Sequence, residues 1–480
     1  MVADVQALHG DSAEIARMKQ LFQQQRDAFS AAPYPSAEQR LQHLDQLKAL
    51  LVENADAICA AITSDFGNRS ADETRMLEII TSLEGIKYQR RHLRQWMKPE
   101  KRAIGAMQFP ARAWVTYQPL GVVGVIVPWN YPLFLATGPL MAALAAGNRV
   151  MIKMSEFTPA MGQLFQELLA KYFPENQIAV VNGEADVAAA FSSLPFDHLL
   201  FTGSTNVGRH VMRAAAENLT PVTLELGGKS PCIISENFPM RDAASRLAYG
   251  KCFNAGQTCV ATDYILCPES RVDELIASLT DMVSEMYPTI RDNGDYTSII
   301  NDRQYQRLQS LLEDAREKGA RIIEINPANE DTSATRKIPL TLVLDIRDDM
   351  RIAQEEIFGP LMPVIPYKGL DQALAYVNAR PRPLALYYFD YNDANCQRVL
   401  EQTHAGGVSL NDTISHVGVD DLGFGGVGPS GMGRYHGKEG FLVFSNPKGV
   451  LRKGRLNFIV AALPPFGRGI HNLIYKLFIK

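Results

Sequence analysis

Short apolar runs that alternate with helix-like stretches are the feature that most constrains the fold of this chain. From about residue 122 onward, runs of four to seven residues rich in Val and Ile recur, with helix-like stretches such as 158–173 between them. Each run is too short for a buried helix, so the alternation predicts βαβ units and a parallel sheet with helices on both faces. The predicted strands of this first series are 122–128, 149–153, 178–183, 198–203 and 222–227.

A second alternating series begins near Pro231. The break between the two series falls at residues 227–231, where we place a domain boundary. Two or three domains are expected in any case, because single cores stop growing near about 250–300 residues and this chain has 480. Before both series, residues 12–60 show helical spacing of leucines. The predicted strands of the second series are 232–235, 263–267, 321–325, 342–346, 361–367, 384–390 and 406–412.

Charge and cysteine usage exclude several classes of protein. The net charge of −4, with Lys and Arg scattered, gives no reason to expect a nucleic-acid partner. None of the six cysteines lies in a CxxC pair and no His cluster accompanies them, so we expect no metal site and no disulfide framework. The start lacks the pattern of a signal peptide, and no apolar run approaches the roughly 18–20 residues of a membrane span. A cytoplasmic location follows by default.

The end of the chain, residues 470–480, reads as an amphipathic helix. Ile470, Leu473, Ile474, Leu477 and Phe478 fall on one helical face. Most apolar helix faces are docked, so the first interpretation is a helix packed on the body or on a second subunit. The alternative is a helix that lies on a membrane surface.

The segment FNAGQTCV, residues 253–260, contains the best candidate nucleophile. Cys259 follows Gly and small polar residues, which suggests a turn that presents a thiol in a cleft, and such a thiol attacks as thiolate. A buried structural cysteine is the alternative that spacing alone leaves open. Glu225 ends a strand-like run. If that strand is buried, the carboxyl has a raised pKa and suits a general base; at a strand edge it would face water instead.

These segments together resemble the aldehyde dehydrogenase superfamily. FNAGQTC is similar to its nucleophile motif, LELGGKSP (224–231) to its general-base motif, and PWNYP (128–132) to its oxyanion segment. EEIFGP (355–360) and FTGST (201–205) are similar to its cofactor-contacting segments. The finer resemblance is to coniferyl aldehyde dehydrogenases. It rests on the stretches DFGNRS (65–70), PFDHLLFTGST (195–205), DNGDYTSIIN (292–301), RIIEINPA (321–328) and GFGGVGPSGMGRYHGKEGF (423–441).

The resemblance implies a mechanism with three catalytic residues. Cys259 attacks the aldehyde carbon, and the Asn130 side chain and the Cys259 backbone N–H donate to the oxyanion that forms. Hydride then leaves to the nicotinamide and a thioester remains. Glu225 activates the water that hydrolyses this thioester. No metal takes part.

The resemblance also implies where the cofactor lies. Lys153 and Glu156 match the ribose-binding pair, and a carboxylate on the adenosine ribose disfavours a 2′-phosphate, so NAD is expected first and NADP second. Met154 stands where the family commonly has proline. Trp129 matches a position in the cofactor pocket, and a core aromatic is its alternative reading. The remaining implied contacts are Gly203, Ser204 and Gly208 at a helix start that favours pyrophosphate, Glu356 on the nicotinamide ribose and Phe358 beside the nicotinamide.

The expected architecture is an α/β fold with two Rossmann-like, doubly wound domains and a small β arm for oligomerisation. The arm extends a sheet across subunits, so we expect a homodimer, with a tetramer as the alternative. The expected parts are an NAD-binding domain of residues 1–104 and 118–226, a catalytic domain of residues 227–412, an oligomerisation element of residues 105–117 and 430–460, and an amphipathic tail of residues 461–480.

Three other functions stay open. A medium- or long-chain aliphatic aldehyde is the alternative substrate, because the sequence does not give the shape of the substrate tunnel. Tyr131, Phe134 and Phe253 could line an aromatic pocket or pack in the core. A coenzyme A-acylating enzyme would resolve the thioester with a thiol, although Glu225 favours hydrolysis. An inactive relative that serves as a binding protein is the alternative from another class.

Overall fold

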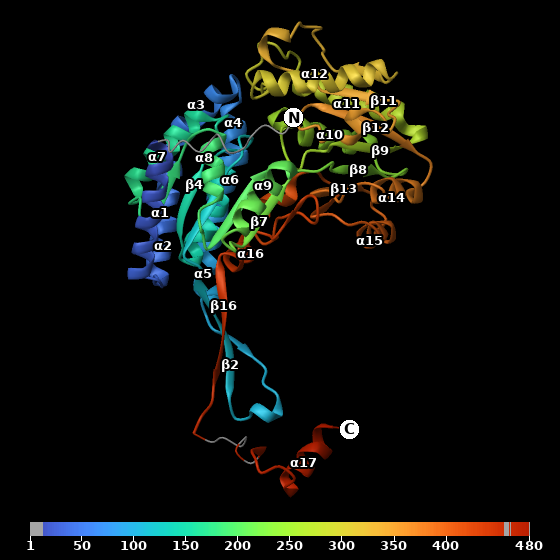
Figure 1. Cartoon of the computed structure of the whole chain (residues 1–480). Helices are drawn as coiled ribbons and strands as arrows, with labels where there is room; N and C mark the ends of the chain where they lie inside the picture. Colours follow the sequence, from blue (N-terminus) through green and yellow to red (C-terminus); the bar gives the residue numbers. More distant parts are fainter. Residues whose placement is uncertain (1–12, 456–459, 461, 480) are drawn as a thin grey trace, which may run out of the picture.

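The computed structural model describes residues 13–455, 460 and 462–479, and its named strands form three sheets of six, seven and three strands. The expected α/β fold is present. Figure 1 shows the two large sheets side by side, with helices around each, and a narrow ribbon of strands that leaves the body. The ends of the predicted parts at residues 1–12, 456–459, 461 and 480 lie outside the described residues. Among the helices of the described ranges, none is long and apolar enough to cross a membrane.

The six-stranded sheet has the order β15-β7-β6-β3-β4-β5, and all its neighbours are parallel except β15 with β7. Successive side chains of β3 enter different cores. Val123 and Val125 belong to one hydrophobic cluster and Val122 and Ile126 to another, so both faces of the sheet are covered. The first strand series is therefore confirmed. The bounds are β3 Val122–Ile126, β4 Arg149–Lys153, β5 Ile178–Val181, β6 His198–Gly203, β7 Val222–Leu226 and β15 Gly431–Met432.

Helices cover this sheet, and the predicted helical region 12–60 is divided among three of them. Pro33 and Pro35 separate the first two, since proline cannot continue a helix interior, and Ser36 caps the second with a capping box. Asn54 separates the second from the third. The bounds are α1 Ala13–Ala31, α2 Ala37–Glu53, α3 Ala55–Phe66, α4 Ala71–Thr74, the π-helix η2 Arg75–Ile80, α5 Thr81–Trp96, α6 Phe134–Ala146, α7 Pro159–Tyr172, α8 Ala185–Ser192, α9 Thr205–Ala216 and α16 Gly437–Val443.

The seven-stranded sheet has the order β10-β11-β12-β9-β8-β13-β14, with only β10 antiparallel to its neighbour. Cys232 and Ile234 of β8 point into one cluster and Ile233 into another, so this sheet too is buried on both faces. The second strand series is confirmed. The strand bounds are β8 Pro231–Ile234, β9 Tyr264–Pro268, β10 Arg321–Glu324, β11 Thr341–Leu344, β12 Leu361–Tyr367, β13 Ala385–Phe389 and β14 Gly407–Leu410.

The helices of this second unit lie between its strands in the chain. They are α10 Met240–Cys252, η4 Phe253–Gly256, η5 Glu269–Arg271, α11 Val272–Met286, α12 Asp302–Glu317, η6 Ser333–Thr335, α13 Arg351–Gln354, α14 Leu370–Asn378, α15 Asp393–Gln402 and η7 Ser415–Gly418.

A three-stranded antiparallel sheet, β1-β2-β16, forms the ribbon that leaves the body (Figure 1). The predicted arm segment 105–117 contributes residues 112–117 to β2, and the predicted segment 430–460 is divided between this ribbon and the six-stranded sheet. β15 pairs instead with β7, and α16 packs against α5 and α6, so residues 431–443 belong with the six-stranded sheet. The bounds are β1 Glu100–Arg102, η3 Ala106–Gln108, β2 Arg112–Pro119, β16 Ser445–Arg452 and, beyond the ribbon, α17 Gly469–Phe478.

Candidate active site

The loop before Cys259 has an unusual backbone. Asn254, Ala255 and Gly256 all have positive φ, at 52°, 50° and 71°, which L-residues other than glycine rarely adopt. At Gly256 a Cβ would lie 2.4 Å from the carbonyl oxygen of Gly359, so only glycine fits there. The loop ends α10 and η4 and turns the chain toward β9. It therefore places residue 259 at the amino-terminal end of the seven-stranded sheet.

Buried side chains fix this loop to its surroundings. Gln257 donates to the carbonyls of Asn254 (2.9 Å) and Ser298 (3.1 Å) and accepts from the backbone N–H of Ile300 (3.0 Å). The backbone N–H of Asn254 donates to Glu73 at 2.7 Å. These hydrogen bonds hold the strained conformation in place.

Cys259 and Glu225 face each other. All six cysteines lie in the described part of the chain, and Cys259 is the one that is not buried. Glu225, on β7, is 1% exposed, and burial raises the pKa of its carboxyl to about 8, while the thiol of Cys259 works in the opposite direction. Burial and the Glu225 carboxylate raise the pKa of the Cys259 thiol. The sulfur is therefore protonated at neutral pH, and the neighbouring Glu225, once ionised, is the base that can take its proton.

Asn130 is held by an ionic cluster. Its carbonyl accepts from Arg69 (3.2 Å) and from the side chain of Asn254 (2.9 Å), and its own Nδ2 donates to the carbonyl of Gln257 at 3.2 Å. Arg69 is fully buried and pairs with Glu78 at 2.8 Å. Asn130 thus lies at the nucleophile loop, with an amide that has a second N–H to offer.

Glu78 completes the cluster at the start of α6. Its Oε2 accepts from the backbone N–H groups of Leu133 and Phe134, at 2.8 and 3.0 Å, where the positive end of the helix dipole favours a carboxylate. Burial nevertheless raises the pKa of Glu78, and Arg69 opposes that shift. The sequence pattern gave no signal for Arg69, Glu73 or Glu78, because the backbone groups that they bind lie 61, 181 and 55 residues away in the chain.

Two cavities that contain charged and polar side chains lie on one side of Cys259. The first, of about 280 Å³, contains Cys259, Glu225, Asn130, Glu356 and Phe358 in its lining. The second, of about 560 Å³, lies over the ends of β3 and β6 and is lined by Glu156 among others. They share Pro128, Trp129, Thr202, Gly203, Ser204 and Gln304, and so form one elongated cleft.

The cleft fits a dinucleotide. Its far part faces the amino end of α9, where Ser204 is the N-cap and backbone N–H groups can bind a phosphate. Thr202 is buried and its Oγ1 has no hydrogen-bond partner among the described residues, which is a polar group left for a ligand. Gln304 and Arg307 of α12, which sequence reasoning missed, line the end near Cys259.

Glu356, Phe358 and Trp129 meet at the end of the cleft near Cys259. Glu356 accepts from the backbone N–H of Gly228 at 3.1 Å, and burial raises its pKa to about 7. Phe358 lies edge-on to Trp129, with ring centroids 5.3 Å apart. Trp129 is half-buried and lines both cavities, so it is more than a core aromatic.

Two predicted cofactor residues do not line the cleft. Lys153 is buried, and its ammonium donates to the carbonyls of Met154 and Gly183, both at 2.7 Å. Gly208 is buried in α9, where a Cβ would lie 2.7 Å from Leu226. The absence of a side chain at 208 lets α9 pack closely on β7, so this glycine acts through packing rather than through contact with a ligand.

A third cavity opens on the other side of the sulfur. It has a volume of about 230 Å³ and Cys259 is part of its wall. The structure brings Tyr131, Phe134 and Phe253 into this wall. Sequence reasoning missed the rest of the lining, which comes from helices and loops in several separate parts of the chain. These other residues are Leu77, Thr81, Leu135, Tyr249, Thr258, Val260, Ile414, Ser415, Val417, Gly418 and Phe424.

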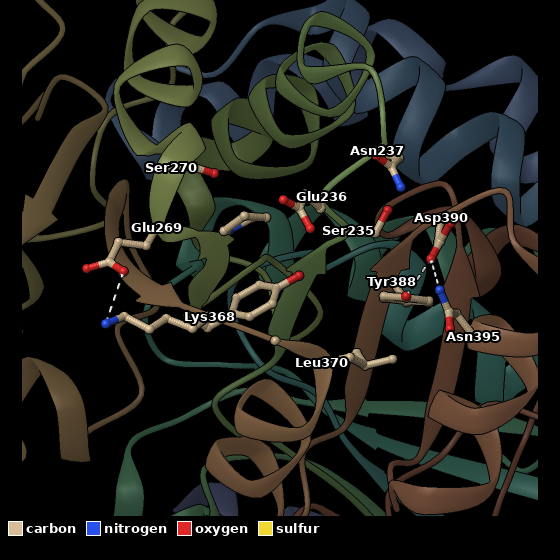
Figure 2. Close-up of a pocket in the computed structure, with 13 residues that line it drawn as sticks. Ser235, Glu236, Asn237, Glu269, Ser270, Lys368, Leu370, Tyr388, Asp390 and Asn395 are labelled. Carbon is tan, nitrogen blue, oxygen red and sulfur yellow. Dashed lines mark hydrogen bonds and ion pairs between the residues drawn. The ribbon is translucent and has the colours of Figure 1, made fainter.

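A separate cavity of about 340 Å³ lies at the opposite end of the seven-stranded sheet (Figure 2). Its lining follows the carboxyl ends of β8, β9, β12 and β13, whereas Cys259 and Glu356 precede the amino ends of β9 and β12. Figure 2 shows its charged groups engaged with neighbours: Lys368 with Glu269, and Asp390 with Tyr388 and Asn395. None of the predicted site residues lies there.

The comparisons with known proteins agree with this geometry. The model of the aldehyde dehydrogenase family matches residues 5–450. A probable coniferyl aldehyde dehydrogenase of Pseudomonas aeruginosa is 59% identical over 480 residues, 100% of each chain. A substrate-bound aldehyde dehydrogenase of Staphylococcus aureus has a TM-score of 0.91 at 39% identity, covering 96% of this chain and 99% of the other. A Mycobacterium tuberculosis aldehyde dehydrogenase complexed with NAD+ has a TM-score of 0.83 at 31% identity, covering 92% and 91%.

Proposed function

Because the chain belongs to the aldehyde dehydrogenase family, we propose that it oxidises an aromatic aldehyde of the coniferaldehyde type to the carboxylic acid, with NAD, through a thioester on Cys259. The observation that carries the proposal is the position of one sulfur between two kinds of cavity. The cleft on one side of Cys259 contains the carboxyl groups of Glu225 and Glu356, and the cavity on the other side is aromatic and mostly apolar. An aldehyde whose carbonyl carbon is at this sulfur can therefore place its substituent in the aromatic cavity while the carbon remains accessible from the cleft.

The residues around the sulfur supply each proton and charge that the reaction needs. Glu225 takes the proton of the thiol, whose pKa is raised in the resting state, and Cys259 then attacks the carbonyl carbon. The second N–H of the Asn130 amide and the Cys259 backbone N–H donate to the oxyanion, an interaction worth roughly 3–4 kcal/mol of barrier per donor. After hydride loss, Glu225 releases the thiol proton to solvent, and its carboxylate then deprotonates the water that hydrolyses the thioester. The nicotinamide cofactor, when bound, accepts the hydride.

The proposed cofactor is NAD rather than NADP. Glu156 lines the far cavity, where its carboxylate suits ribose hydroxyls and opposes a 2′-phosphate. Glu356 and Phe358 would hold and flank the nicotinamide riboside near Cys259. The comparison of kcat/KM with NAD and with NADP measures this preference directly.

The aromatic substrate class rests on the composition of the substrate-side cavity. Aromatic rings of Tyr131, Phe134, Tyr249, Phe253 and Phe424 form much of its wall, and flat rings stack well against such walls. The relative named for coniferyl aldehyde supports the same class. A cytoplasmic location is part of the proposal, because all six cysteines are free thiols.

Replacement of Cys259 by Ala tests the covalent step. We expect oxidation of coniferaldehyde to fall by at least about 10³-fold, since no other group can form the acyl bond. Cys252, which is buried seven residues earlier in the chain without a wall position in either cavity, is the matched control: Cys252→Ala keeps turnover. Full-speed oxidation by Cys259→Ala would refute the mechanism. Absence of NADH formation by the wild type would instead favour the alternative of an inactive relative.

A panel of aldehydes tests the substrate class. Coniferaldehyde and benzaldehyde should exceed hexanal and decanal in kcat/KM, because the cavity wall is aromatic and the cavity volume is about 230 Å³. A reversed order would support the aliphatic alternative without affecting the role of Cys259. NADH formation that requires coenzyme A would instead show that a thiol, not water, resolves the thioester.

A further inference from the structure

The last part of the chain differs in charge from everything before it. Residues 445–480 contain seven Lys or Arg and no Asp or Glu, a charge of +7, while the whole chain carries −4, which leaves −11 for residues 1–444. Such a segregated basic tail on an acidic protein is an electrostatic footprint for an anionic surface.

The described part of this tail also exposes apolar side chains. In α17, Leu473 is 53% exposed, Leu477 62% and Phe478 54%. They share one helical face with Ile470 and Ile474, as amphipathic helices do at interfaces. The aromatic rings of Phe466 and Tyr475 are exposed as well.

The tail does not use this face on its own subunit. Figure 1 shows α17 beyond the tip of the β2–β16 ribbon, away from both large sheets. The ring contacts of His471, the one buried residue of α17, are with Phe466 and Tyr475 of the same segment. A basic helix tethered to a body of charge −11 thus stays exposed, so the acidity of the body alone does not hold it.

We propose that α17 and the basic residues before it bind the surface of an anionic lipid bilayer. The apolar face would enter the boundary between headgroups and acyl chains, and the Lys and Arg side chains would contact anionic headgroups. Two copies of the tail carry like charge, which opposes the packing of one tail on the other, and binding of the tail to the acidic body of a second copy is the alternative that the test distinguishes.

Vesicle co-sedimentation of the full-length protein tests the proposal. The probes are phosphatidylcholine vesicles with and without about one third phosphatidylglycerol, at low and high salt. We expect binding to the anionic vesicles that is at least about tenfold stronger than to neutral ones and weakens about tenfold in high salt, because surface charge is screened.

Two variants separate the contributions. Leu473→Glu with Leu477→Glu places charge on the apolar face and should lower the partition coefficient at least about tenfold, and Lys453→Gln with Lys476→Gln should lower it only for anionic vesicles. Val52→Glu is the matched control, since Val52 of α2 is 55% exposed and outside the tail, and should bind as wild type. All variants keep aldehyde oxidation, which shows that they fold.

Other outcomes overturn the proposal. Absence of binding, or equal binding to neutral vesicles, contradicts an anionic-lipid surface. A change of sedimentation coefficient in Leu473→Glu with Leu477→Glu, without any vesicle binding by wild type, would identify a second copy of the chain as the occupant.

Discussion

Glu225 is the residue whose environment most affects the chemistry. It lies on a strand buried on both faces, and the register of that strand places it beside Thr202 of β6 and Gly431 of β15. No salt bridge reaches it among the described residues, and neither carboxylate oxygen accepts a hydrogen bond of ordinary geometry there. Burial therefore acts almost unopposed, and the pKa rises to about 8, near the pH at which a general base works well.

Replacement of Glu225 by Gln tests this role. A raised carboxyl pKa means that the base is mostly protonated below pH 8 and ionised above it, so wild-type thioester hydrolysis should rise with pH through about 8. In the variant we expect a flat profile and a kcat about 10²–10⁴-fold lower, while a first-turnover burst of NADH persists but forms more slowly, because Glu225 also takes the thiol proton.

The control for that experiment is Glu236→Gln in the separate cavity of Figure 2, which should keep both the profile and kcat. If the burst and kcat of Glu225→Gln fell by the same factor, Glu225 would act mainly on the thiol rather than on the hydrolytic water.

At the scale of elements, the π-helix η2 and the segment before α4 brace the active site. Arg69 and Glu73 precede η2 and Glu78 lies within it, and these three residues contact the segment of Asn130, the start of α6 and the nucleophile loop. π-helical turns occur frequently at functional sites because they redirect side chains. Here the turn helps three separate elements to share one buried ionic cluster.

Replacement of Arg69 by Met should affect both stability and rate. It leaves Glu78 buried without its partner, so we expect a loss of about 3–5 kcal/mol in the free energy of unfolding, measured with denaturant. The double variant Arg69→Met with Glu78→Gln should recover most of this loss, because no unpaired charge remains.

The kcat of the double variant should stay about tenfold or more below that of the wild type, since the backbone carbonyl of Asn130 has lost the Arg69 donor that positions it. Arg40→Met is the matched control. Arg40 is also fully buried and bound to backbone carbonyls, at Ala145 and Ala146, so its loss should lower stability and leave kcat unchanged. Recovery of kcat together with stability in the double variant would argue against a positioning role.

At the scale of the whole molecule, the ends of strands from both large sheets place residues around the sulfur of Cys259. Glu225 comes from the end of β7, and Cys259 and Glu356 precede strands of the other sheet. The change from one sheet to the other between β7 and β8 supports the proposed division into an NAD-binding and a catalytic domain near residue 227, with the ribbon as a third part. The ribbon leaves edge strands unpaired, which supports the proposed homodimer.

The homodimer predicts a concentration-dependent particle of twice the chain mass in sedimentation velocity. Leu451 of β16 is 52% exposed, and if the ribbon is the contact, Leu451→Asp should weaken dimerisation at least about tenfold, because it buries a charge in the interface. Leu400→Asp on α15, where Leu400 is 42% exposed, is the control and should sediment as wild type. A wild-type tetramer would favour the alternative, and an unchanged Leu451→Asp would place the interface elsewhere.

The sequence by itself determined what depends on neighbours along the chain. The alternation of apolar runs predicted the strands of both large sheets, since periodicity and run length are local, and the motifs around Cys259, Glu225 and Asn130 indicated the family and its chemistry. The long leucine-rich start was less clear, because Pro33, Pro35 and Asn54 divide it into three helices.

Only the tertiary structure decided what depends on residues distant in sequence. It showed that Gly208 fits close helix packing and that the Lys153 ammonium donates to the backbone carbonyls of Met154 and Gly183. It assembled the aromatic cavity from segments as far apart as those of Leu77 and Phe424, and it buried Arg69 against Glu78. Burial, pKa and cavity shape arise from contacts between side chains that are distant in the chain. Local sequence patterns do not determine those contacts.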